Sequence, residues 1–227
     1  EAVSLIANDR TRVIDASTAH RVAPGWVYGF PEISGRDAVA NAMRVSNPGC
    51  YSTGFIALVA PLVKAGLLPA DWPYTCNAVS GYSGGGKAMI AEFESGAAPT
   101  AWRTYALGLA HKHVPEMMVH TGLQAKPLFL PVVSNFYKGL AVTVPLHLAQ
   151  LRPGTRDVDL HAAYVQRYSG ERFIRVMPLR DPGVLEGDKG YFDVQGANDS
   201  NRVDLFVFAD DSRALLIARL DNLGKGA

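Results

Sequence analysis

The chain has 227 residues, of which 48% are hydrophobic and 19% are charged, as in an ordinary soluble globular protein. Its formal charge is only +1 and its 22 basic residues are scattered, which argues against nucleic-acid binding and favours small-molecule chemistry. No apolar run approaches the roughly 18 residues of a membrane span, and the first residues show no signal-peptide pattern, so we expect a cytoplasmic protein of one full domain and part of another.

Short apolar runs separated by turn-rich segments make up residues 1–46. Strands are predicted at residues 12–15, which should be buried, and at residues 43–45. These runs are consistent with the last strands of a doubly wound sheet, whose glycine-rich strand–turn–helix unit would lie ahead of residue 12. We therefore expect the chain to be truncated at its start.

A lone cysteine, Cys50, stands at the start of a predicted helix. Residues 47–49 (Asn-Pro-Gly) are turn formers, and residues 53–65 are long and apolar enough for a buried helix, interrupted only by Pro61. The open N–H groups and the helix dipole at such a start lower a thiol pKa from about 8.5. We interpret Cys50 as a nucleophilic thiolate. Cys76 lies far away with no CxxC pattern, so neither a disulfide nor a zinc site is predicted.

The glycine-rich segment 80–87 follows a predicted strand at residues 74–79 and precedes a predicted helix at residues 88–94. It spells most of a Walker A motif, but Ala88 stands where a Ser or Thr should bind Mg²⁺. No second strand ends convincingly in a Walker B carboxylate, so a P-loop nucleotidase is disfavoured. The backbone N–H groups of the loop can still bind an anion.

The rest of the chain mixes helices and strands. Helices are predicted at residues 114–124 and 158–168, and strands at residues 128–133, 139–148, 172–176, 202–209 and 214–220. Residues 181–200 include five Gly or Pro, which is typical of a long surface connection.

A nucleophilic Cys50 needs a base, and the segment 111–116 (His-Lys-His-Val-Pro-Glu) offers two histidines at a predicted helix start. A histidine there could take the thiol proton, pair with the thiolate, and later exchange a proton at the substrate carbonyl oxygen. Glu116 could orient the imidazole. The remaining histidines have no such setting and are expected to be structural or exposed: His20, His120, His147 and His161.

Five motifs together resemble one family. Residues 46–54 (SNPGCYSTG) are similar to the active-site signature of the N-acetyl-gamma-glutamyl-phosphate reductases, relatives of aspartate-semialdehyde dehydrogenase and of the glyceraldehyde-3-phosphate dehydrogenase catalytic domain. The resemblance extends to residues 15–21 (DASTAHR), 25–32 (GWVYGFPE), 111–116 (HKHVPE) and 220–227 (LDNLGKGA). It covers nearly the whole chain and is strongest for the shorter of the family's two subtypes.

The resemblance implies an α/β fold, with an α+β catalytic domain like that of glyceraldehyde-3-phosphate dehydrogenase, built on a mixed sheet with helices. Residues 1–46 would be the remnant of a Rossmann-type NADP-binding domain, residues 47–219 the catalytic and oligomerisation domain, and residues 220–227 the start of a segment returning to the cofactor domain. A homo-oligomer, dimer or tetramer, is implied. We expect the chain to be truncated at both ends, and alone to bind NADPH weakly without appreciable turnover.

The resemblance also assigns roles to residues. One histidine of the pair is the catalytic base; we favour His113, with His111 as a substrate or phosphate contact, and Glu116 beside them. Contacts with the NADP cofactor are expected from Ser17, Thr18, Ser80, Gly81, Ser83, Gly84 and Asn222. Contacts with the substrate are expected from Arg21, Asn47, Arg103 and Lys112.

These assignments predict an enzyme, an oxidoreductase of arginine biosynthesis. Cys50 would attack N-acetyl-L-glutamyl 5-phosphate to form a thioester, which NADPH reduces to N-acetyl-L-glutamate 5-semialdehyde. Three alternatives stay open: another acyl-phosphate or semialdehyde dehydrogenase of the superfamily, a thiol hydrolase, which needs no nicotinamide, and a catalytically incomplete fragment acting only as an assembly domain.

Overall fold

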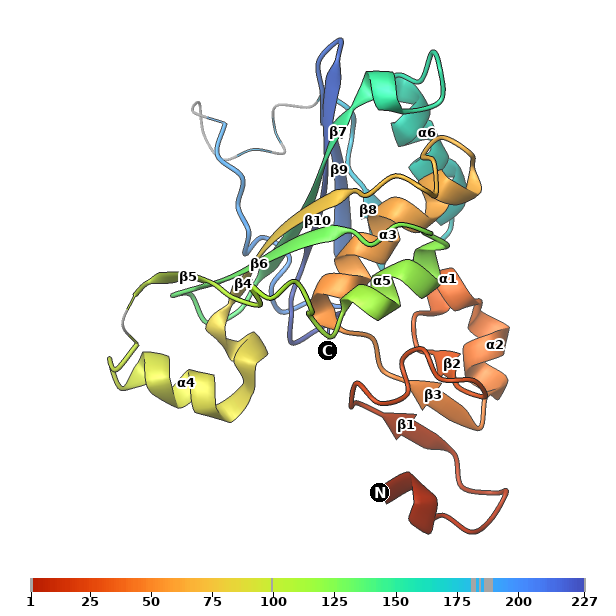
Figure 1. The fold of residues 1–227 in the computed structure, drawn as a ribbon, viewed down its shortest axis with the longest axis vertical. Coiled ribbons are helices and arrows are strands. Elements are labelled where there is room, and N and C mark those ends of the chain that lie inside the picture. Colours follow the sequence, from red (N-terminus) through yellow and green to blue (C-terminus); the bar gives the residue numbers. More distant parts are fainter. Residues whose placement is uncertain (1, 99, 181–182, 184, 186–189, 227) are drawn as a thin grey trace.

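Two β-sheets organise the chain (Figure 1). The structure, a computed structural model, describes residues 2–98, 100–180, 183, 185 and 190–226. Much of the predicted connection at residues 181–200, namely residues 181–182, 184 and 186–189, therefore lies outside the described residues. No helix in the described part of the chain is long and apolar enough to cross a bilayer.

The smaller sheet lies in the N-terminal part of the chain, with strand order β1-β3-β2 and parallel pairing throughout. Its elements are η1 (Ala2–Leu5), β1 (Val13–Asp15), β2 (Val27–Tyr28), α1 (Pro31–Ser34), α2 (Arg36–Asn41) and β3 (Arg44–Ser46). The expectation that the first strand is buried is wrong: Ile14 is 76% exposed, because β1 is an edge strand. The proposed domain boundary after residue 46 stays a prediction.

The larger sheet has seven strands in the order β5-β6-β4-β7-β10-β9-β8. The strands are β4 (Thr75–Gly81), β5 (Trp102–Thr104), β6 (Leu128–Ser134), β7 (Leu140–His147), β8 (Ile174–Val176), β9 (Val203–Ala209) and β10 (Arg213–Leu220). The pairs β4–β6 and β8–β9 are parallel and the others antiparallel. The expected α/β fold on a mixed sheet is therefore confirmed.

Helix α3 (Cys50–Lys64) packs on this sheet between α5 (Val114–Thr121) and α6 (Asp157–Tyr168), and nearly all of it is buried (Figure 1). The remaining helices are η2 (Tyr82–Gly85), α4 (Gly86–Glu94) and η3 (Leu148–Gln150). Helix α5 ends earlier than predicted because Gly122 takes the left-handed conformation that closes a helix.

A proline inside the buried α3 is compensated from α6. Pro61 has no N–H, so the carbonyl of Ala57, four residues earlier, loses its helical partner. The hydroxyl of Tyr168 donates to that carbonyl at 2.7 Å, and Tyr164 donates to the neighbouring carbonyl of Leu58 at 2.8 Å. The apolar helix that begins at Cys50 is therefore fixed to α6 by hydrogen bonds as well as by packing.

We expect Tyr168→Phe to lower the free energy of unfolding by about 1–3 kcal/mol, because it leaves the buried Ala57 carbonyl without a donor. Urea unfolding followed by circular dichroism measures the change. The control is Tyr191→Phe, at an exposed tyrosine, which should shift stability by less than about 0.5 kcal/mol. Equal effects of the two substitutions would contradict this role of Tyr168.

Candidate active site

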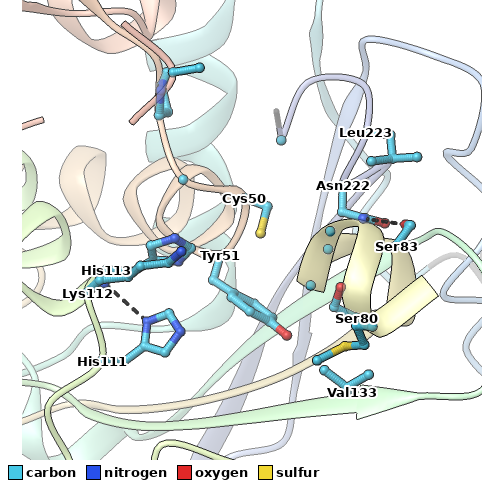
Figure 2. A pocket seen from close by; sticks show the side chains of 18 of the residues that line it. Cys50, Tyr51, Ser80, Ser83, His111, Lys112, His113, Val133, Asn222 and Leu223 are labelled. Carbon is cyan, nitrogen blue, oxygen red and sulfur yellow. Dashed lines mark hydrogen bonds between the residues drawn. The ribbon is translucent and has the colours of Figure 1, made fainter. Parts of the chain in front are cut away.

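Cys50 is the first residue of α3 and lines a cavity of about 390 Å³ (Figure 2). The turn before α3, the loop after β4, the segment before α5 and the C-terminal segment contribute its walls. The structure brings together ten of the predicted site residues: Arg21, Asn47, Cys50, Ser80, Ser83, Gly84, His111, Lys112, His113 and Asn222.

Five predicted residues do not line this cavity. Ser17 and Thr18 are exposed in the turn after β1, where the Ser17 hydroxyl donates to Asp15 at 2.7 Å, and Gly81 is buried at the end of β4. Arg103 pairs with Glu92 at 2.8 Å and its guanidinium covers Phe93, so its expected contact with substrate stays a prediction. The fifth residue, Glu116, lies behind the cavity.

Glu116 does not orient an imidazole, contrary to expectation. Its almost fully buried carboxylate accepts hydrogen bonds from the Arg21 guanidinium at 2.9 Å and from the Tyr28 hydroxyl at 2.9 Å. It also accepts the backbone N–H of Gly49 at 3.0 Å. Glu116 therefore fixes the turn that precedes Cys50. It also holds Arg21, a buried residue that lines the cavity.

The two histidines occupy one side of the cavity (Figure 2). His113 is buried at the N-cap of α5, and its backbone N–H donates to Nδ1 of His111 at 3.1 Å. Within the described part of the chain, Nδ1 of His113 has no hydrogen-bond partner. Its other nitrogen, Nε2, would lie 2.3 Å from a Cβ on Gly49, so a side chain at this position, directly before Cys50, would displace the imidazole.

Burial shifts the pKa values of both Cys50 and His113. It raises the pKa of the Cys50 thiol to about 11, although the backbone N–H groups of Tyr51 and Cys50 and the charge of Arg21 act in the opposite direction. Burial, and then the neighbouring His111, Arg21 and Lys112, lower the pKa of His113 to about 2. Both shifts favour the uncharged forms, a thiol and a neutral imidazole, contrary to the expected thiolate.

The C-terminal segment forms the opposite wall (Figure 2). The Asn222 amide donates to the Ser83 hydroxyl at 2.9 Å, and its oxygen accepts the backbone N–H of Gly139 at 2.9 Å. Asn222 is therefore held rigidly beside the loop after β4.

Sequence reasoning missed several wall residues: Ala16, Tyr51, Gly85, Gly86, Met89, Tyr105, Val133, Leu223 and Gly226. Tyr51 and Leu223 adjoin predicted site residues, so chain proximity could have found them. Tyr105 and Val133 carry no local signal, because the pairing of β6 with β5 and with β4 brings them to the cavity.

A cysteine at the start of a helix that packs on a mixed seven-stranded sheet, with a buried histidine in the same cavity, is consistent with a catalytic domain of the semialdehyde dehydrogenase class. The family model described as "Semialdehyde dehydrogenase, dimerisation domain" matches residues 50–222. Among solved structures, aspartate semialdehyde dehydrogenase II from Vibrio cholerae has a TM-score of 0.66 at 19% identity, covering 95% of this chain and 68% of that one. Aspartate semialdehyde dehydrogenase from Francisella tularensis has a TM-score of 0.67 at 12% identity, covering 95% and 71%. These two show the fold.

Curated relatives identify the particular family. N-acetyl-gamma-glutamyl-phosphate reductase 2 of Nostoc sp. is 48% identical, covering 100% of this chain and 74% of the relative. N-acetyl-gamma-glutamyl-phosphate reductase 2 of Pseudomonas putida is 50% identical, covering 100% and 73%. The chain belongs to the N-acetyl-gamma-glutamyl-phosphate reductase family, which is a family of oxidoreductases with a nicotinamide cofactor.

We expect iodoacetamide to label Cys50 in preference to Cys76, and the Cys50 rate to rise about tenfold per pH unit between pH 7 and 10, because only the thiolate reacts and its fraction grows up to a pKa of about 11. Peptide mapping by mass spectrometry measures both sites. Cys76 is fully buried in β4 and serves as the internal control for unfolding. A Cys50 rate that levels off near pH 8 would show a thiolate poised at neutral pH and contradict this charge state.

Proposed function

We propose that this protein catalyses the NADPH-dependent reductive dephosphorylation of N-acetyl-L-glutamyl 5-phosphate to N-acetyl-L-glutamate 5-semialdehyde, a cytoplasmic step of arginine biosynthesis. Family membership supports the substrate. The observation that carries the chemistry is the meeting of Cys50, His113 and the buried Arg21 in one cavity.

The first step is acyl transfer to Cys50. Its sulfur attacks the carbonyl carbon of the acyl phosphate while the thiol proton passes to the imidazole of His113, which lines the same cavity. The bond from that carbon to the phosphate oxygen then breaks, leaving a thioester on Cys50 and free phosphate. Backbone N–H groups at the open start of α3 favour the negative charge that develops on the carbonyl oxygen.

We assign the binding of the substrate's phosphate group to Arg21. Asn47 and Lys112 are further polar residues that line the same cavity. Glu116 engages only Nη1 of Arg21, and within the described part of the chain its buried Nε has no hydrogen-bond partner. A fixed guanidinium with donors to spare suits a leaving phosphate.

The wall formed by Ser80, Ser83, Gly84 and Asn222 suits a nicotinamide ring, since it combines a fixed amide, two hydroxyls and the apolar Leu223. When bound there, a reduced nicotinamide supplies a hydride to the thioester carbon. The carbon–sulfur bond of the reduced adduct then breaks as the aldehyde forms, and the Cys50 sulfur recovers its proton from His113. NADP rather than NAD is part of the proposal.

We expect His113→Asn to lower turnover by about 10²–10⁴, because the thiol then has no base. His111→Asn should raise KM with little change in turnover, because His111 contacts substrate at the cavity rim. Phosphate-dependent NADP⁺ reduction with N-acetyl-L-glutamate 5-semialdehyde, catalysed by the full-length protein, measures both. The reverse pattern would exchange the two roles, and two mild phenotypes would reject both assignments.

We further propose that two copies of the chain associate through the larger sheet. Helices α3, α5 and α6 lie along one face of it (Figure 1). In β6, buried Phe129 contacts Tyr51 of α3, whereas its neighbours point to the other face of the sheet. Exposed apolar side chains lie on three strands of the sheet: Trp102, Leu128, Leu130 and Leu215. The family description as a dimerisation domain supports a homo-oligomer, and this face supports a dimer as its basic unit.

We expect the double substitution Leu130→Glu and Leu215→Glu to convert the dimer to a monomer, because it places charges in the apolar interface. Sedimentation velocity measures the mass. The control is Val165→Glu on α6, which lies on the helical side of the sheet. Val165 is 48% exposed, and the leucines of the proposed interface are similarly exposed, at 37% and 44%. Dissociation by the control, or a dimer that survives both glutamates, would contradict the proposed interface.

A further inference from the structure

The last described residues, 222–226, come within contact distance of Cys50. Leu223 and Gly226 line the cavity, and a Cβ on Gly226 would lie 3.0 Å from the Cβ of Cys50. Asn222 and Leu223 face the histidines across the cavity (Figure 2). The placement of this segment therefore sets the space around the thiol.

Asn222 is held by its own hydrogen bonds, but the residues after it have few anchors. Among the described residues, the backbone N–H groups of Leu223, Gly224 and Gly226 donate to Asp221, which directly precedes the segment. Within residues 223–226, the Lys225 side chain hydrogen-bonds to an element that lies far away in the sequence.

That element is the first turn of α1. The Lys225 ammonium donates to both carboxylate oxygens of Glu32, each at 2.8 Å, across 193 residues of sequence. Glu32 is 1% exposed, and the ammonium lies 5.4 Å and 5.5 Å from the ring centres of Phe30 and Phe173. The carboxylate is thus removed from water, whereas the Lys225 side chain is 16% exposed, so the carboxylate depends on this cation.

Neither partner lines the cavity of Cys50. Lys225 instead borders a second cavity of about 210 Å³, behind the Asn47–Pro48 turn that precedes Cys50. A buried ion pair is a poor source of net stability, but it enforces one arrangement of the segments that carry it.

We infer that the Glu32–Lys225 ion pair is a positioning device for the active site, which holds residues 223–226 against Cys50 from behind the cavity. The inference rests on the proposed nucleophilic role of Cys50. Without the pair, this wall moves away, the thiol opens to solvent, and the substrate carbonyl loses its fixed approach to the sulfur.

The test is the double variant Glu32→Gln/Lys225→Met, which removes both charges and so leaves neither buried alone. We expect iodoacetamide to label Cys50 about tenfold faster at fixed pH while Cys76 stays unlabelled, which is the signature of local opening. Turnover of the full-length protein should fall by about 10²-fold with little change in KM, because a displacement of the reacting groups by about 1 Å has an effect of this size. Lys225→Arg, which keeps the pair, should retain wild-type labelling and most of the turnover.

The matched control is Asp157→Asn/Arg180→Met, which removes another ion pair with a nearly buried carboxylate, remote from the cavity. It should change neither labelling nor turnover. Faster labelling of both cysteines in the Glu32/Lys225 variant would show global loosening and overturn the inference, as would unchanged Cys50 labelling. Absence of reductase activity in the wild type would refute the proposed function alone, because the labelling comparison still decides the role of the pair.

Discussion

The buried carboxylate of Glu116 is the constraint on which the site depends. It joins the segment after β1 through Arg21, the small sheet through Tyr28, and the turn before α3 through the Gly49 N–H. A carboxylate removed from water costs several kcal/mol unless such donors surround it, so the three segments are held together. The direction of the Gly49 N–H in turn fixes where α3 begins, and with it the position of Cys50.

Burial acts on Cys50 and His113 in opposite directions. It raises the pKa of Cys50 and lowers that of His113, and so favours the uncharged form of both. An acyl phosphate would bring negative charge toward Arg21, whose Nε has no hydrogen-bond partner among the described residues although its Nη1 pairs with Glu116. A protonated thiol is also less prone to oxidation than a thiolate, which suits a nucleophile at rest.

Sequence reasoning found most residues of the candidate site, which the fold brings to one cavity, because their signals are local. The turn formers and apolar run around Cys50, and the charge-dense segment ending at Glu116, are readable within a few residues. What it missed is tertiary. The thiol pKa depends on desolvation by the whole fold. The surroundings of Glu116 depend on partners from three segments, and the placement of Arg103 depends on its ion pair with Glu92. The strand β5 (Trp-Arg-Thr) has one apolar residue in three, which is too little pattern to be recognised.

The central claim is that Cys50 accepts the acyl group, and the thioester itself tests it most directly. The protein would be incubated with N-acetyl-L-glutamyl 5-phosphate without any nicotinamide, quenched in acid, and mapped by peptide mass spectrometry. Because no hydride is available, the reaction should stop after acyl transfer. The expected result is an N-acetylglutamyl adduct on the Cys50 peptide that hydroxylamine removes and that Cys50→Ala abolishes. An unmodified Cys50, or an adduct that persists in Cys50→Ala, would contradict the account.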